Sequence, residues 1–187
     1  MKNKFKNQLG FTLVEMLIAV SLFIVVVTIS IGALLSVYDA NRKAQSSKTV
    51  VDNLNLGIEN MTRTIRFGSS YFCGVSSSIS ATSDCSGGNN SVSVTFKGNR
   101  IIYKWNGTIN DPIQRSDDGG INYTSITSPE TKIQYLKFYV FGSNPNPNTD
   151  TEQPYVIAVI KGYSGSKLTT QTEFSIETLM SQRKHDI

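Results

Sequence analysis

The sequence predicts an α+β fold, in which one long N-terminal helix packs on an antiparallel β-sheet. Three observations support this class: an apolar run covers residues 11–37, apolar positions then recur every three or four residues to about residue 67, and short alternating segments follow. The 187 residues suffice for one ordinary domain with an appendage. Only one stretch is long enough to span a membrane, which excludes both a polytopic transporter and a simple soluble cytosolic domain.

The positive charge of the chain is concentrated at its N-terminus. The formal net charge is +4, and Lys2, Lys4 and Lys6 precede the apolar run with no acidic residue among residues 1–10. Lysines on one side of a membrane segment mark the cytoplasmic side, so we expect the residues after the run to be exported. The remaining chain has 15 basic and 14 acidic residues, which gives no basic surface that would predict nucleic-acid binding.

The apolar run of residues 11–37 reads as a retained membrane helix. It would be about 40 Å long as a helix, longer than the core of a secretory signal, and no A-x-A-like cleavage site closes it. Glu15 is the one charged residue in the run, and a carboxylate inside a membrane costs on the order of 2.5–3.5 kcal/mol. Its partner would come from another chain, from headgroups or from a new terminus nearby; the alternative is that Glu15 lies at the membrane interface.

Gly10-Phe11-Thr12-Leu13-Val14-Glu15, preceded by lysines and followed by the apolar run, resembles the class III signal of type IV pilins and type II secretion pseudopilins. The resemblance implies that prepilin peptidase, a membrane aspartyl peptidase, cuts between Gly10 and Phe11 and N-methylates Phe11. It also implies that Glu15 pairs with the new amine of a neighbouring subunit during assembly. The sequence departs from major pilins at Gly32, where these often carry proline.

Together these features divide the chain into a cytoplasmic leader (1–10), a transmembrane helix (11–37), an amphipathic continuation (38–67) and an extracytoplasmic β-rich head (68–187). The continuation is predicted from an apolar stripe that should pack on the sheet of the same chain, and residues 68–70 (Gly-Ser-Ser) should end the helix. A coiled-coil seam is the alternative, but the stripe covers barely two heptads. The stripe consists of Val51, Leu54, Ile58, Met61 and Ile65.

The head shows the patterns of an antiparallel sheet of four or five strands. Residues 91–105 read as a hairpin that turns at 97–99, residues 133–141 alternate, residues 155–160 form an apolar run typical of a central strand, and residues 168–176 close the sheet. Residues 73–91 and 142–154 read as loops, and residues 181–187 as a frayed tail. The segment 174–178 with Gln182 and Arg183 resembles the end of J-type minor pseudopilins.

Cys73 and Cys85 lie twelve residues apart in a Ser/Gly-rich segment. Export from the cytoplasm favours a disulfide between them, and two free thiols are the alternative. Three acidic residues beside the glycines at 119 and 120 could bind calcium, although a turn is the preferred interpretation. These are Asp111, Asp117 and Asp118.

No catalytic site and no metal or cofactor site is expected. The only histidine is His185 in the tail, and no phosphate-binding glycine loop, dinucleotide fingerprint or zinc-protease motif occurs. A membrane-tethered hydrolase is therefore disfavoured. Five aromatic residues read first as core or sheet-face positions, with an adhesive or DNA-binding surface as the alternative. They are Tyr103, Trp105, Tyr135, Tyr139 and Tyr155.

The resemblance thus implies a non-enzymatic prepilin-like subunit, more specifically a minor pilin or pseudopilin of a type IV pilus or type II secretion pseudopilus. Its partners would be prepilin peptidase, other pilins or pseudopilins, an inner-membrane assembly platform and, before assembly, membrane lipid; a nucleic-acid partner is not expected. It would cross the inner membrane once and later enter a surface or periplasmic filament. The rival hypothesis is a membrane-anchored extracytoplasmic binding module that never polymerises.

Overall fold

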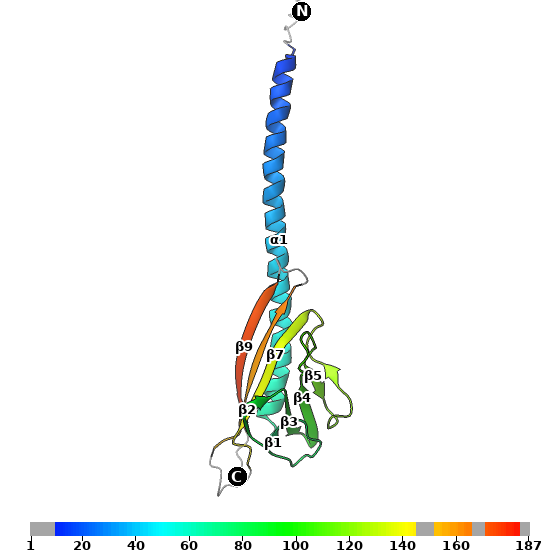
Figure 1. The fold of residues 1–187 in the computed structure, drawn as a ribbon, viewed down its shortest axis with the longest axis vertical. Coiled ribbons are helices and arrows are strands. Elements are labelled where there is room, and N and C mark those ends of the chain that lie inside the picture. Colours follow the sequence, from blue (N-terminus) through cyan, green and yellow to red (C-terminus); the bar gives the residue numbers. More distant parts are fainter. Residues whose placement is uncertain (1–9, 145–151, 166–170, 184–187) are drawn as a thin grey trace, which may run out of the picture. The chain divides into compact units, whose positions relative to one another are not determined.

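The computed structural model describes residues 10–144, 152–165 and 171–183 (Figure 1). The leader lysines, most of the expected loop 142–154, the start of the expected strand 168–176 and His185 lie outside these ranges. The chain divides into two compact units, Met1–Arg42 and Lys43–Ile187. The α+β class is confirmed, because one helix and antiparallel strands make up the fold.

One helix, α1 (Leu13–Arg66), covers almost the whole of the predicted range 11–67. Its basic residues Arg63 and Arg66 lie in the last turn, where the negative end of the helix dipole favours them. The helix ends at Arg66, and the amide of Gly68 just beyond it donates to the carbonyl of Ile65 at 3.0 Å. Within the first unit nearly every side chain of α1 is exposed, which is unusual for so apolar a sequence.

In the second unit α1 buries one stripe against the sheets. The predicted stripe is confirmed at Leu54, Met61 and Ile65 but wrong at its first position, because Val51 is 54% exposed while Val50 is 3% exposed. Successive helical residues are about 100° apart, so Val50 lies about 40° from Leu54 around the axis and Val51 about 60° on the other side. Because both residues are valines, hydrophobicity alone does not predict which of the two is buried.

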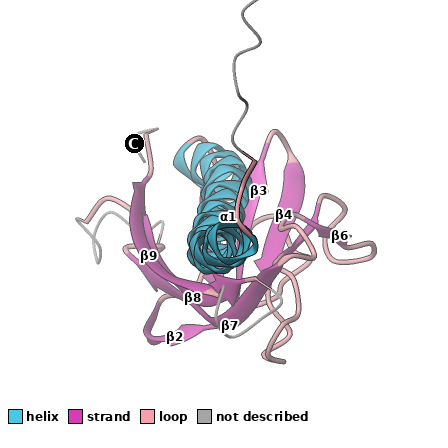
Figure 2. Cartoon of the chain, turned by 90° about the horizontal axis from the view of Figure 1, so that it is seen from above, coloured by secondary structure: helices cyan, strands magenta, loops and turns pink. Residues whose placement is uncertain are grey.

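The strands form two sheets rather than the single sheet expected. One sheet has the order β1-β3-β4-β5-β6 and the other the order β2-β7-β8-β9, with all pairs antiparallel. Figure 2 shows both sheets curving around α1. The strands are β1 (Ser69–Cys73), β2 (Cys85–Asn89), β3 (Ser91–Phe96), β4 (Asn99–Lys104), β5 (Gln114–Ser116), β6 (Thr124–Ser125), β7 (Thr131–Phe141), β8 (Tyr155–Ser164) and β9 (Thr172–Ser181).

The hairpin expected at 91–105 is confirmed as β3 and β4. Phe96 pairs with Asn99, and the two turn residues Lys97 and Gly98 have φ values of 52° and 81°. Positive φ at both central positions gives the tight turn that matches the twist of a hairpin. The expected loop 73–91 is wrong over residues 85–89, which form β2 along β7. That strand reads CSGGN and has no apolar alternation from which it could be predicted.

The three long strands of the second sheet confirm the predictions at 133–141 and 155–160, and β8 is the central strand between β7 and β9. In β7 the buried residues Ile133 and Leu136 are three apart, because a β-bulge shifts the register between Ile133 and Tyr135. The strand expected at 168–176 is confirmed only in part, because β9 continues beyond residue 176 to Ser181.

The expected frayed tail is also wrong where it can be compared. Gln182 is 3% exposed, and its Nε2 donates to the carbonyl of Gly68 at 3.1 Å. The amide of Arg183 donates to the carbonyl of Arg66 at 2.8 Å. The end of β9 is therefore fixed to the end of α1.

The core lies between α1 and the inner sides of both sheets. Of the five aromatic residues considered, Tyr103 and Trp105 are buried, whereas Tyr135, Tyr139 and Tyr155 are half-buried. Tyr103 belongs to the core cluster with Met61 of the helix and Phe138 of the other sheet. The aromatic residues thus separate into core positions in the first sheet and surface positions in the second.

Candidate functional site

The junction between Gly10 and Phe11 lies outside the helix and is exposed. Both residues precede the first helical residue, Leu13, and the side chain of Phe11 is 78% exposed. A Cβ atom placed on Gly10 would meet nothing within 4 Å. The fold itself therefore places no demand for glycine at this position, so such a demand would come from a partner that binds the junction.

Thr12 caps the start of α1. The amide of Glu15 donates to Thr12 Oγ1 at 3.3 Å, and the amide of Met16 donates to the Thr12 carbonyl at 3.2 Å. Threonine followed three residues later by glutamate is the sequence signature of a capping box, so the role of Thr12 was readable from the sequence but was not among the expected site residues. The cap lies after the Gly10–Phe11 bond, and a cut at that bond would leave the helix start intact.

Glu15 occupies the first turn of α1 and is exposed. The N-terminal end of the helix dipole favours a carboxylate there, by about 0.3–1 kcal/mol. No ion pair joins Glu15 to any residue within the described ranges. The stabilisation by the local dipole is thus small against the cost of placing this charge in a membrane, so the start of the helix does not by itself compensate the carboxylate.

The helix that follows is long and apolar enough to cross a membrane. Three of its hydroxyl groups donate to backbone carbonyls within the helix: Ser21 to Ile18 at 2.8 Å, Thr28 to Ile24 at 2.8 Å and Ser30 to Val26 at 2.8 Å. Such internal bonds are what an apolar medium requires of polar groups. Glu15 is the one charged residue between residues 11 and 37.

Residues 5–31 match the sequence profile of the prokaryotic N-terminal methylation motif. The chain carries this motif. It spans the junction, the Thr12 cap, Glu15 and most of the apolar stretch, and it is consistent with the type IV pilin and pseudopilin family. The J-type subtype has no support from this match. No curated protein and no solved structure is significantly similar to the chain.

Outside the methylation motif, Cys73 and Cys85 are joined by a disulfide with their Cα atoms 5.8 Å apart. Cys73 is the last residue of β1 and Cys85 the first of β2, so the bond links the edges of the two sheets. It closes the segment 74–84, which runs along the outside of β1 through the bridge between Phe72 and Ser83.

The acidic residues near 111–118 form turn contacts. Asp117 pairs with Arg115 at 2.6 Å, and Asp118 accepts from the Ser116 hydroxyl at 2.6 Å. The hydrogen bonds from Ser116 and from the amide of Asn122 hold the pKa of Asp118 well below its usual value. Among the residues that the structure describes, no group of three or more His, Cys, Asp or Glu side chains is placed to hold a metal ion.

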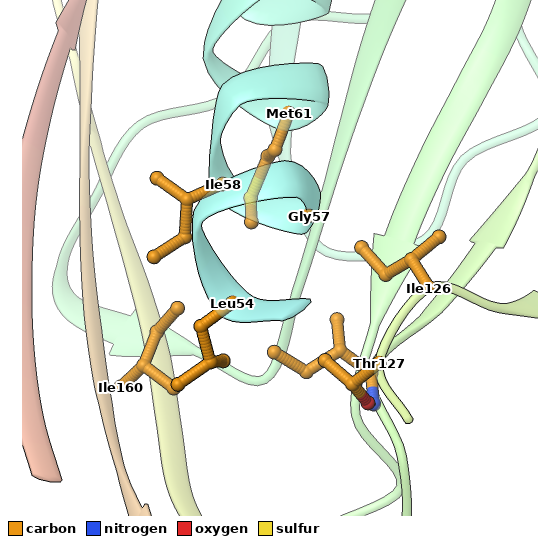
Figure 3. A pocket seen from close by; sticks show the side chains of 8 residues that line it. Leu54, Gly57, Ile58, Met61, Ile126, Thr127 and Ile160 are labelled. Atoms are coloured by element: carbon orange, nitrogen blue, oxygen red, sulfur yellow. The ribbon is translucent and has the colours of Figure 1, made fainter. Parts of the chain in front are cut away.

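A narrow apolar gap lies where α1 meets the sheets (Figure 3). Leu54, Gly57 and Met61 of α1 face Ile126 and Ile160 across it, and the gap has no room for a water molecule. It is lined almost wholly by apolar groups and offers a ligand no polar contact. We therefore regard it as a packing defect of the core rather than as a binding site.

Proposed function

We propose that the protein is a minor pilin or pseudopilin that is cut between Gly10 and Phe11, methylated on Phe11 and assembled into a filament. The methylation motif indicates a prepilin-like protein, which implies processing by prepilin peptidase and assembly with other pilins. The observation that carries the proposal is the exposed Gly10–Phe11 junction directly ahead of a capped helix, whose apolar run up to residue 37 holds one charged residue, Glu15.

The geometry suggests how processing and assembly are linked. A cut between Gly10 and Phe11 keeps the Thr12 cap of the helix and creates a cationic amine on Phe11. Glu15 of one subunit would pair with the amine of a neighbour, which neutralises two charges in an apolar setting and fixes the axial register. The apolar side chains of residues 11–37, which are exposed in the single chain, would exchange lipid for neighbouring helices in the filament.

The same exposed surface supports membrane insertion before assembly. The apolar segment of α1 is exposed on all sides, and such a segment needs lipid or other helices around it. The leader would lie in the cytoplasm, the second unit outside it, and an inner-membrane platform would extract the helix. A subunit with a large β-rich unit would initiate a short filament or lie at its tip. The filament would serve secretion, pilus assembly or DNA uptake.

Mass spectrometry of the mature N-terminus tests the proposal. In cells with active prepilin peptidase, we expect the loss of residues 1–10 and one added methyl group on Phe11. Gly10→Val is the matched variant, because Gly10 contacts nothing and the substitution should leave the fold intact. We expect this variant to keep its leader.

A wild-type chain that keeps residues 1–10 beside an active peptidase would contradict processing. It would favour the rival function, a membrane-anchored binding module that does not polymerise. Normal processing of Gly10→Val would show that the peptidase does not require glycine at position 10.

A further inference from the structure

The sheet β2-β7-β8-β9 has one side against α1 and one side that faces away from it (Figure 2). We name the second side the outer face. The register places Tyr139 of β7, Ile157 of β8 and Leu179 of β9 in one row of this face, since their neighbours Phe138, Ala158 and Met180 are buried. In β8, in β9 and on each side of the bulge in β7, every second residue therefore points outward.

The middle of the outer face is apolar and aromatic. Leu179 is 63% exposed, and Tyr139, Ile157 and Val159 are half-buried. Phe141 and Tyr155 stack at the end of the face, with ring centroids 5.1 Å apart. A sheet face in contact with water commonly carries polar residues, so this apolar centre predicts a partner surface.

The two sides of the outer face carry opposite charges. One row reads Lys137, Val159, Glu177 from β7 to β9, and another reads Lys132, Tyr163, Glu173. Each lysine is two strands from its glutamate, about 9.5 Å, which is too far for a direct ion pair. No ion pair joins these lysines and glutamates in the described part of the chain.

We propose that the outer face binds the outer face of a second copy of this chain, through a two-fold axis parallel to β8. Such an axis places β7 of one copy opposite β9 of the other at the same height. Lys137 then faces Glu177 of the other copy, Lys132 faces Glu173, and each contact occurs twice. The proposal does not depend on filament assembly.

Lys161 of β8 fits this arrangement although it lies close to the axis. Its Nζ is 5.8 Å from the centroid of the Tyr135 ring, so the side chain leans towards β7. In the dimer that direction leads to β9 of the other copy, where Ser175 lies between Glu173 and Glu177. The two copies of Lys161 therefore lean away from one another and towards acidic residues.

The curvature of the sheet determines which residues meet. The sheet wraps around α1, so its outer face is convex and β8 lies at the crest (Figure 2). Val159 and Ile157 would meet at the centre, while the long lysine and glutamate side chains would reach across the wider gaps beside it. The strands run along the C-terminal part of α1 (Figure 1), so both copies would have Lys43 at the same end of the dimer, as two chains anchored in one membrane require.

The three strands offer on the order of 400 Å² per copy, about half of a standard interface. An interface of this size is weak in dilute solution. Anchoring both copies in one membrane raises their effective concentration, which favours a contact that would otherwise dissociate. We therefore expect the dimer in membranes and not among chains diluted in detergent.

Cysteine crosslinking of the full-length protein, in membranes of cells that lack prepilin peptidase, tests the contact without filament assembly. Val159→Cys lies on the axis and should form a covalent dimer with a short bifunctional maleimide. Leu179→Cys is the matched control on the same face, because it lies off the axis and should not link to itself. A mixture of Leu179→Cys and Tyr139→Cys chains should link.

Charge exchange provides the second test, applied to the Val159→Cys chain. Lys137→Glu and Glu177→Lys should each lower the crosslinked fraction about fivefold, because each replaces two attractive contacts by repulsive ones. The double variant Lys137→Glu/Glu177→Lys should restore it. Thermal unfolding should be unchanged in all three, since these positions lie outside the core.

Three outcomes would overturn the proposal: a monomeric Val159→Cys chain, a crosslink to a protein of different mass, or a double variant that stays as weak as the single ones.

Discussion

At the scale of single residues, two glycines beside the core differ in the space around them. A Cβ atom on Gly57 would lie 3.4 Å from the carbonyl oxygen of Ile126, an ordinary contact, and would enter the apolar gap (Figure 3). Glycine inside a helix costs roughly 1 kcal/mol relative to alanine. We expect Gly57→Ala to raise the free energy of unfolding of the full-length protein in detergent by about 0.5–1 kcal/mol.

Gly68→Ala is the matched control, because its Cβ would collide with Val94 Cγ2 and lie 2.9 Å from the carbonyl of Thr64. We expect this variant to unfold at lower denaturant concentration than the wild type. If Gly57→Ala were instead less stable than the wild type, the added methyl group would not fit between α1 and the carbonyl of Ile126.

The residue scale also shows where sequence patterns succeed. Leu54, Met61 and Ile65 are buried as their spacing predicts, because a helix of known period needs only one apolar stripe to be oriented. The cap at Thr12 likewise follows a local signal, the spacing of threonine and glutamate at residues 12 and 15. The choice between Val50 and Val51 depends on how α1 is rotated against the sheets, which is a tertiary property that local sequence does not encode.

At the scale of elements, the segment 74–84 is held by a buried cation. Arg100 of β4 is 2% exposed, and its guanidinium donates to the carbonyls of Ser70 at 2.6 Å, Ser76 at 3.2 Å and Ala81 at 3.1 Å. Burial lowers the pKa of Arg100 to about 10, so it stays charged at neutral pH. A planar fork can bridge three carbonyls in a way that a lysine ammonium cannot.

We therefore expect Arg100→Lys to lower the free energy of unfolding by about 2 kcal/mol, since carbonyls lose charged donors. Chemical denaturation of the full-length protein in detergent measures this loss. Arg63→Lys is the control, because Arg63 is exposed and the substitution keeps its positive charge in the last turn of α1. Equal effects of the two substitutions would contradict the special role of Arg100.

The elements that the sequence did not reveal share a physical cause. The long strand β7 has its own apolar alternation and β8 contains a continuous apolar run, and these local patterns predict both strands. By contrast β2 has no such pattern; it pairs with β7, and its first residue, Cys85, is bonded to Cys73 of β1. The division into two sheets likewise depends on pairings between distant segments, such as β1 with β3, which local patterns do not specify.

At the scale of the whole molecule, the first unit combines a largely exposed apolar helical segment, residues 13–37, with one carboxylate in its first turn, Glu15. Two explanations for Glu15 make different predictions: it either supports the helix start through the capping sequence and the dipole, or it pairs with a cationic terminus during assembly. Thr12→Val removes the hydrogen bond to the Glu15 amide and keeps the carboxylate. Glu15→Leu removes the carboxylate and keeps the Thr12 hydroxyl.

We expect Glu15→Leu to enter the membrane and be processed normally but to be depleted at least tenfold from sheared filaments, a loss of about 1.4 kcal/mol or more in the incorporation equilibrium. Glu15→Asp retains the charge and should be incorporated to an intermediate degree. Thr12→Val should be incorporated almost as the wild type, because one cap contributes only about 1 kcal/mol to a helix of 54 residues that packing elsewhere supports. Quantitative immunoblotting of filament and membrane fractions measures all three. If Glu15→Leu were incorporated normally, Glu15 would have no partner in the filament. If Thr12→Val failed as completely as Glu15→Leu, the start of the helix rather than the carboxylate would control assembly.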